Sequence, residues 1–128
     1  MERELFSSGT PWEPIVGYSR AVKVGDRIWV SGTTATDAGG KIVGKGDAYA
    51  QTRQAIANIE RALTLAGARL GDVVRTRVYV RDATRWEPVA HVHARYFGEV
   101  RPVNTLVQIG ALVGDCEIEI EAEAEVGA

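Results

Sequence analysis

The sequence predicts a single α+β domain in which two helices cover one face of a mixed β-sheet. Two segments, residues 47–66 and 84–97, carry apolar residues at helical spacing. Segments in which apolar and polar residues alternate stand before, between and after them. Two crossovers of the usual right-handed sense place both helices on the same side of the sheet. The other side is then left for solvent or for another subunit.

Composition supports one ordinary domain over residues 1–128. With 45% apolar and 25% charged residues, the chain has the profile of a soluble globular protein. A domain of this size buries roughly 65–70% of the surface that its unfolded chain exposes, which is enough for a core without disulfides or metals. The formal net charge of −2 argues against a dedicated nucleic-acid binder, because such a protein needs a basic face.

We expect a cytoplasmic protein without membrane association. Residues 1–6 include acidic side chains and no apolar stretch follows them, unlike a signal peptide. No apolar run approaches the ~20 residues that cross a bilayer. The single cysteine, Cys116, excludes a disulfide framework within the chain, and we interpret it as an inert thiol.

The first predicted elements are a β-hairpin and a short strand. Residues 19–24 and 27–31 alternate around a Gly-Asp step, with Ile28 and Val30 on one face. Residues 41–43 are expected to form a further short strand.

The first helix is predicted over residues 47–66. Asp47 suits its N-cap, and Gly67 suits a left-handed cap at its C-terminus.

The remaining segments complete the sheet and its second helix. Residues 73–80 form a strand whose strict alternation predicts one face made of Val74, Thr76, Val78 and Val80. A second helix follows over 84–97, and strands are predicted at 104–109 and 117–126.

The last strand is chemically unusual. Its isoleucines and alanines alternate with five glutamates, at positions 117, 119, 121, 123 and 125. Residues two apart on a strand are roughly 6.5–7 Å apart, so such carboxylates repel unless other charges intervene. Arg27, Arg75 and Arg77 lie on matching polar faces and are candidate partners. Two interpretations stay open: a solvated face with cross-strand ion pairs, or a face that partly closes against another subunit and lines a polar cleft.

Other motifs favour structural interpretations. Residues 39–46 nearly match a phosphate-binding loop, but Gly46 stands where the Mg²⁺-binding Ser or Thr is needed. His91 and His93 are two apart on a predicted helix and do not face each other, so we expect no metal site. The Ser31-Gly32 step ends a strand, where a glycine lets a ligand approach the backbone.

Several segments share the order and spacing of one family. Residues 17–25 read Gly-Tyr-Ser-Arg-Ala-Val-Lys-Val-Gly, and residues 28–32 read Ile-Trp-Val-Ser-Gly. Further matching segments are residues 51–59, 66–68, 73–80, 101–107 and 117–122. Together they resemble the RidA/YjgF family of reactive-imine deaminases, whose members are also labelled endoribonuclease L-PSP. The resemblance covers residues 16–124.

The resemblance implies a chorismate-mutase-like fold and a homotrimer with clefts between subunits. It implies no metal and no cofactor. In imine-hydrolysing members, an arginine two residues after a proline clamps the substrate carboxylate, and a glutamate of the last strand orients the attacking water. A tyrosine and a Ser-Gly step wall the cleft.

Carried over residue by residue, the resemblance implies a changed site. Tyr18, Ser31 and Gly32 match the cleft wall, and Glu119 matches the water-orienting glutamate. Asn104 stands at the position of the arginine, so the charged, bidentate carboxylate clamp is missing there. Trp86 is a further candidate for the cleft wall.

We therefore expect a RidA-like trimer that binds a small polar metabolite in clefts between subunits. Hydrolysis of an imine, an enamine or another C–N substrate, with Glu119 as the catalytic residue, is one alternative. A non-enzymatic binding, regulatory or chaperone-like trimer is the other. A ribonuclease rests on the family label alone, and the acidic last strand opposes phosphate binding.

Overall fold

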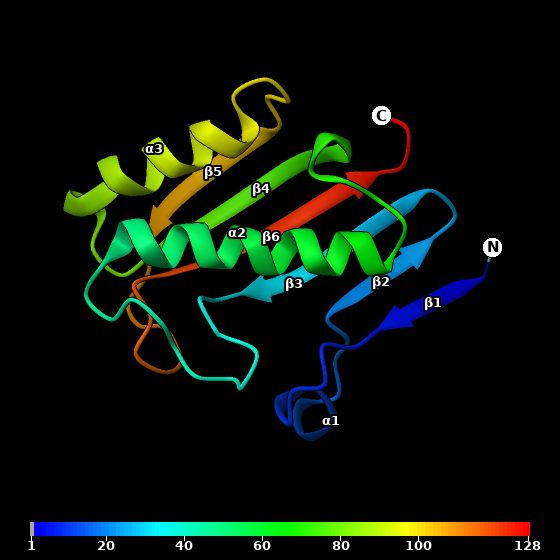
Figure 1. Cartoon of the computed structure of the whole chain (residues 1–128), viewed down its shortest axis with the longest axis horizontal. Helices are drawn as coiled ribbons and strands as arrows, with labels where there is room; N and C mark the ends of the chain where they lie inside the picture. Colours follow the sequence, from blue (N-terminus) through cyan, green and yellow to red (C-terminus); the bar gives the residue numbers. More distant parts are fainter. Residues whose placement is uncertain (1) are drawn as a thin grey trace.

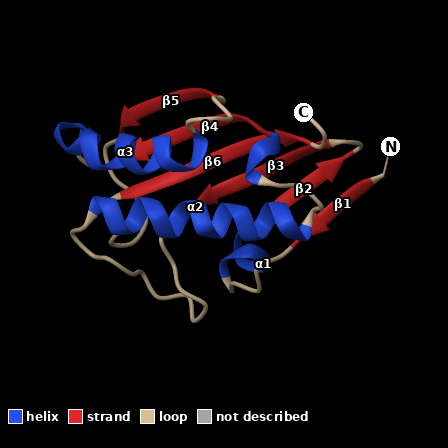
Figure 2. Ribbon diagram, turned by 45° about the horizontal axis from the view of Figure 1, so that its top comes forward, coloured by secondary structure: helices blue, strands red, loops and turns tan. Residues whose placement is uncertain are grey.

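The computed structural model describes residues 2–128 as one six-stranded sheet with two long helices on one face (Figures 1 and 2). The strands are β1 (Arg3–Phe6), β2 (Ala21–Val24), β3 (Arg27–Thr33), β4 (Val73–Val80), β5 (Val103–Gln108) and β6 (Ile118–Glu125). The helices are α1 (Trp12–Val16), α2 (Ala48–Leu65) and α3 (Trp86–Phe97), with 3₁₀ turns at Leu70–Asp72 and Ala83–Arg85. The predicted α+β class is confirmed.

The sheet is mixed and has the order β1-β2-β3-β6-β4-β5. Only β4 and β5 run parallel, and α3 forms the crossover between them. All other neighbouring strands are antiparallel. As predicted, α2 and α3 lie on the same side, and no helix formed by residues 2–128 covers the opposite side of the sheet (Figure 2). We call that side the open face.

Local signals explain why α2 begins and ends where it does. The Asp47 carboxylate accepts a hydrogen bond from the Ala50 backbone amide at 3.0 Å, which satisfies one of the free amides at the helix start. Gly67 adopts a φ of +84° after the last turn, a conformation that glycine adopts without strain. Both predicted caps are confirmed.

The core lies between the two long helices and the sheet. From β6 it takes the four alternate apolar residues, Ile118, Ile120, Ala122 and Ala124. From α2 it takes Ala55, Ile56, Ile59, Ala62 and Leu63. The intervening glutamates of β6 therefore point to the open face.

Two local predictions are wrong. Val74 is 40% exposed and does not share a face with Thr76, because a bulge between Val73 and Arg75 shifts the register of β4 against β6. Residues 41–43 form no strand, only a single bridge between Thr36 and Ile42.

The N-terminal region contains β1 and α1, two elements that the sequence patterns did not predict. β1 buries no residue fully, so its sequence carries no alternation. α1 has five residues, too few for helical periodicity to appear. Within residues 2–128, no helix combines the length and apolarity needed to cross a membrane.

Candidate active site

Glu119 lies on the open face near one end of β6, against the backbone of Gly32. Its neighbour across the sheet is Tyr79 of β4. The side chain is half-buried, and a methyl group at Gly32 would overlap its carboxylate oxygen Oε2. The missing side chain of Gly32 therefore creates the space that the Glu119 carboxylate occupies. The close approach expected at this glycine is present, although the approaching group belongs to the protein.

Arg20 joins this pair from the segment that precedes β2. Its Nη1 donates hydrogen bonds to the Gly32 carbonyl at 3.1 Å and to Thr33 Oγ1 at 3.0 Å. Its guanidinium carbon lies 5.7 Å from the centroid of the Tyr18 ring, within the range of a cation–π contact. Tyr18, Arg20, Gly32 and Glu119 thus form one cluster, which we call the Glu119 cluster.

The environment of Glu119 raises the pKa of its carboxyl group. Burial is the main cause, because it disfavours the charged form. The positive charge of Arg20 opposes this effect, and the negative charge of Glu121 adds to it. A carboxyl group with a raised pKa exchanges protons closer to neutral pH, as general acid–base catalysis requires.

Ser31 supports the cluster through the fold. Its hydroxyl donates a hydrogen bond to the Ser19 carbonyl at 2.6 Å. This bond ties the end of β3 to the segment that carries Tyr18 and Arg20. The hydroxyl is therefore already used in positioning the wall of the site.

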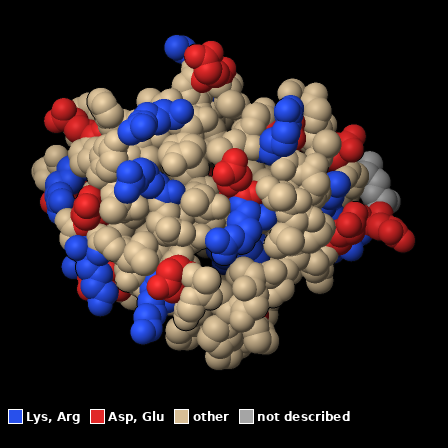
Figure 3. Space-filling model, in the orientation of Figure 1, with Lys and Arg blue, Asp and Glu red and all other residues tan. Residues whose placement is uncertain are grey.

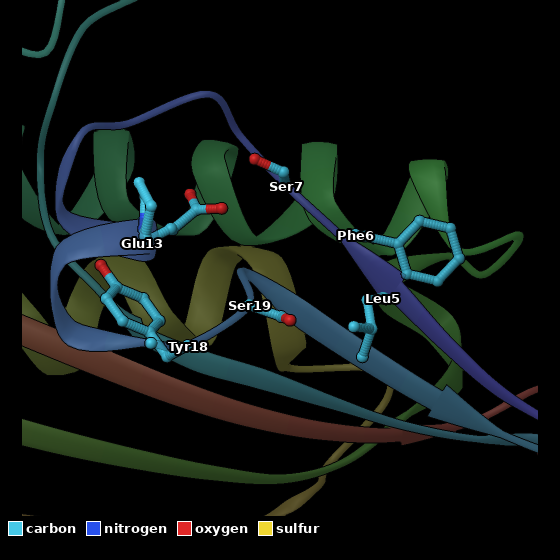
Figure 4. Close-up of a pocket in the computed structure, with 8 residues that line it drawn as sticks. Leu5, Phe6, Ser7, Glu13, Tyr18 and Ser19 are labelled. Carbon is cyan, nitrogen blue, oxygen red and sulfur yellow. The ribbon is translucent and has the colours of Figure 1, made fainter.

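An open pocket of about 390 Å³ lies beside Tyr18. Its lining residues are Leu5, Phe6, Ser7, Glu13, Pro14, Gly17, Tyr18 and Ser19. Glu13 and Tyr18 lie at its α1 end, and Leu5 and Phe6 extend along β1 (Figure 4). The β1–α1 region, which the sequence patterns did not predict, thus forms a hollow next to the Glu119 cluster.

Glu13 holds this region together. Its Oε2 accepts hydrogen bonds from the Ser8 hydroxyl at 2.6 Å, the Ser8 amide at 3.2 Å and the Thr10 hydroxyl at 3.1 Å. Burial alone raises its pKa, but the hydrogen bonds outweigh burial and lower the pKa to about 2. Glu13 is thus a permanently charged acceptor that fixes the turn before Tyr18.

The rest of the open face carries the cross-strand pairs that the sequence predicted. Arg75 and Arg77 lie 3.3 Å and 3.5 Å from Glu123. The Tyr79 hydroxyl donates a hydrogen bond to Glu121, which raises the pKa of Tyr79. Arg27 instead lies over the Trp29 ring, 5.3 Å from its centroid.

Asn104 lies apart from the Glu119 cluster. It pairs in register with Thr76, whose buried hydroxyl donates a hydrogen bond to Asn104 Oδ1 at 3.3 Å and lies 2.8 Å from His93 Nε2. In-register neighbours share a face, so Asn104 lies on the helix-bearing side, with β4 between it and Glu119. Trp86 begins α3 on the same side and is 52% exposed. One chain therefore does not bring Asn104 and Glu119 together.

The surroundings of the two histidines and of Cys116 indicate structural roles for these residues. His91 is exposed, whereas His93 is half-buried and burial lowers its pKa. Burial raises the pKa of the Cys116 thiol, which keeps it protonated and unreactive. Among residues 2–128, no group of three or more His, Cys, Asp or Glu side chains is arranged to hold a metal ion.

Comparison with known proteins decides the family. The family model described as endoribonuclease L-PSP matches residues 9–126. The chain belongs to the RidA/YjgF family. The 3-aminoacrylate deaminase RutC of Acinetobacter baylyi is 36% identical over 122 residues, which are 95% of this chain and 96% of that protein. A RutC family protein of Pyrococcus horikoshii is 37% identical over 97% of this chain and 98% of its own length.

Solved structures of RidA/YjgF proteins have the same fold. A YjgF/YER057c/UK114 family member from Mycobacterium tuberculosis matches with a TM-score of 0.89 and 48% identity, over 98% of this chain and 100% of that chain. The YjgF gene product of E. coli matches with a TM-score of 0.83 and 30% identity, over 94% and 96% of the two chains. The expected chorismate-mutase-like fold is thus confirmed.

Arg20 is the member of the Glu119 cluster that the sequence patterns did not single out. It stands in the matched segment 17–25, but there it reads as one polar residue of an alternating strand. Its role becomes visible only when β3 brings Gly32 and Thr33 against its guanidinium. A charged residue directly before the buried Ala21 was the available signal.

Proposed function

We propose that this chain hydrolyses a small imine or enamine and releases ammonia, as a cytoplasmic homotrimer with Glu119 as the catalytic residue. The observation that carries the proposal is the half-buried Glu119 carboxyl, with its raised pKa, in the space left by Gly32. The relative from Acinetobacter baylyi, named a 3-aminoacrylate deaminase, supports a reaction at a C–N bond.

The proposed reaction needs one group that takes and returns a proton. Water attacks the imine carbon, a C–O bond forms, and the π electrons of the C=N bond move to nitrogen, which is protonated. Glu119 takes the proton that the attacking water loses and passes it to the nitrogen. The proton of the new hydroxyl group then passes to the amino group, the C–N bond breaks and ammonia leaves, and the oxygen becomes the carbonyl of the product. Imine and water thus yield a carbonyl compound and ammonia.

The open face supports assembly into a homotrimer. Three exposed apolar side chains, Trp29, Val103 and Val107, lie on it beside the polar network. Exposed apolar surface of this kind suits burial between copies of a chain. Assembly also offers a way for Asn104 and Trp86 of one subunit to face Glu119 of another, as the proposed clefts require. Sedimentation equilibrium measures the assembly directly, and a mass of one or two chains would contradict a trimer.

A binding trimer without catalysis is the second candidate. It is favoured by Asn104, because a neutral amide held by Thr76 replaces a charged clamp at that position. In this case the small polar ligand binds in the same clefts without turnover. A ribonuclease has less support, since basic and acidic side chains are interspersed on the helix-bearing face (Figure 3).

Ammonia release from imines tests the proposal. An amino-acid oxidase generates the imines in situ, and the protein is expected to accelerate ammonia release. The Glu119→Gln variant should lose on the order of 10²–10⁴-fold in rate, the usual contribution of a general acid–base group. Glu123→Gln is the matched control, because it lies on the same strand and face but is paired with Arg75 and Arg77. No acceleration by the wild type, or equal rates for both variants, would overturn the proposal.

A further inference from the structure

Arg20 has unused hydrogen-bonding capacity beside the catalytic carboxyl group. Nη1 is the only guanidinium nitrogen that donates to another residue between residues 2 and 128. Nε is buried and has no acceptor in that part of the chain. Nε and Nη2 form one edge of the guanidinium, the edge that a carboxylate can bind with both oxygens. A buried donor is costly to leave unpaired, so this edge of the guanidinium favours binding an acceptor that a ligand supplies.

Glu119 is not that acceptor. In the described part of the chain no ion pair within 4.0 Å joins it to Arg20, although the Arg20 charge acts on the Glu119 carboxyl. Arg75 and Arg77 on the open face differ, because both are already paired with Glu123. Arg20 is therefore a positive charge that is fixed in place, close to Glu119 and not neutralised by direct contact.

We propose that Arg20 is the substrate-anion-binding residue of this site and holds the carboxylate of a 2-imino acid with its imine carbon towards Glu119. The inference rests on the proposed hydrolysis at Glu119. Position 104, where the resemblance implies the clamp, carries an amide on the other side of the sheet. Arg20 restores a planar, permanently charged donor to the site from the segment that precedes β2. The site is then selective for substrates that carry an anionic group.

Binding of the reaction product tests this assignment without requiring turnover. Hydrolysis of a 2-imino acid yields a 2-oxo acid, so 2-oxobutyrate is the probe and the neutral 2-oxobutyramide is its control. Calorimetry on the wild type should show tighter binding of the acid than of the amide. Arg20→Gln should weaken binding of the acid by about 30-fold or more and leave the amide unchanged, because a desolvated charge pair loses one partner. Arg20→Lys keeps the positive charge but lacks the two parallel N–H donors of the guanidinium. Its affinity for the acid should lie between those of the wild type and Arg20→Gln.

Arg27→Gln is the matched control variant. Like Arg20, Arg27 lies over an aromatic ring, but it donates no hydrogen bond to Gly32 or Thr33. Its acid and amide affinities should equal those of the wild type. If Arg20→Gln does not fold, the comparison of Arg20→Lys with Arg27→Gln decides the assignment.

The pH dependence of the reaction rate is a second test, because a purely structural role of Arg20 would leave it unchanged. Because the Arg20 charge lowers the pKa of Glu119, its removal should shift the acidic limb of the rate profile to higher pH. Wild-type affinities that are equal for acid and amide, or an acid affinity unchanged in Arg20→Gln, would overturn the role of Arg20 while leaving Glu119-dependent ammonia release intact. Selective acid binding through Arg20 without any ammonia release would support the anion-binding role of Arg20 and contradict the proposed hydrolysis.

Discussion

Two carboxyl groups near Tyr18 are removed from water and yet respond in opposite ways. Glu13 is 5% exposed and its pKa is lowered to about 2. Glu119 is half-buried and its pKa is raised. The difference lies in the donors, since the Ser8 amide and two hydroxyl groups bind the Glu13 carboxylate, whereas no residue between 2 and 128 donates a hydrogen bond to the Glu119 carboxyl group. Burial alone favours the neutral acid, and donors reverse that preference.

This contrast separates a structural carboxylate from one whose setting suits proton transfer. The Glu13 carboxylate is already bound by donors of the preceding turn. It is therefore less available to a ligand, and it stabilises the conformation of residues 7–13. The Glu119 carboxylate occupies the space beside Gly32, and no side chain or backbone amide between residues 2 and 128 donates a hydrogen bond to its oxygens. A group with free oxygens and a raised pKa suits proton transfer to water and substrate.

Among variants that keep both carboxyl groups, closing the space over Gly32 should have the largest effect. In Gly32→Ala, the added methyl group displaces the Glu119 carboxylate, the flexible end of a side chain, and leaves the backbone in place. We expect a loss on the order of 10²-fold in kcat/KM, the usual effect of a 1 Å misplacement, with little change in thermal stability. Gly39→Ala is the control, because its methyl group would lie in ordinary contact at 3.4 Å from Asp37. Unchanged activity in Gly32→Ala would break the link between this cavity and catalysis.

Removing the charge of Glu13 should reduce stability. Glu13→Gln is expected to lower the free energy of unfolding at neutral pH by about 1–3 kcal/mol, because charge-assisted hydrogen bonds are weakened. The contribution of Glu13 is present above its unfolded pKa of 4.5 and is lost as the pH falls towards about 2. The difference between wild type and variant, measured by urea unfolding, should therefore shrink over that range. A constant difference would contradict the assigned role.

The Glu119→Gln variant should change stability in the opposite direction. The pKa of Glu119 is higher in the folded protein than in the unfolded chain. Its charged carboxylate therefore lowers the free energy of unfolding as the pH rises through the unfolded value of 4.5 and beyond. The variant should therefore be more stable than the wild type at pH 7 and equal to it well below pH 4.5. Glu123→Gln should instead be less stable by about 0–1 kcal/mol, as for partly exposed ion pairs. Destabilisation of both variants at pH 7 would contradict the expected gain in stability for Glu119→Gln.

Much of the fold could be predicted because its signals are local. The Gly25-Asp26 turn, the caps of α2 and the alternation of β6 each lie within a few residues. The N-terminal strand and α1 escaped prediction because they bury too little to leave a pattern. The bulge at Val74 depends on pairing with β6, which is more than 40 positions away in the chain.

The site was less accessible to sequence reasoning than the fold. Tyr18, Gly32 and Glu119 were singled out through the family resemblance, and the structure brings them to one cluster. Strand order could not be derived from local patterns, so the separation of Asn104 from Glu119 by β4 was not foreseen. Arg20 was missed for the same reason, since its partners lie on a different strand.

A titration of the glutamate carboxyl groups by carbon-13 NMR tests the central contrast most directly. Glu13→Gln and Glu119→Gln assign the two resonances by their absence. We expect Glu119 to titrate above the ordinary value of 4.5 and Glu13 to titrate near 2. Two groups that titrate together near 4.5, or a Glu119 that titrates below that value, would contradict it.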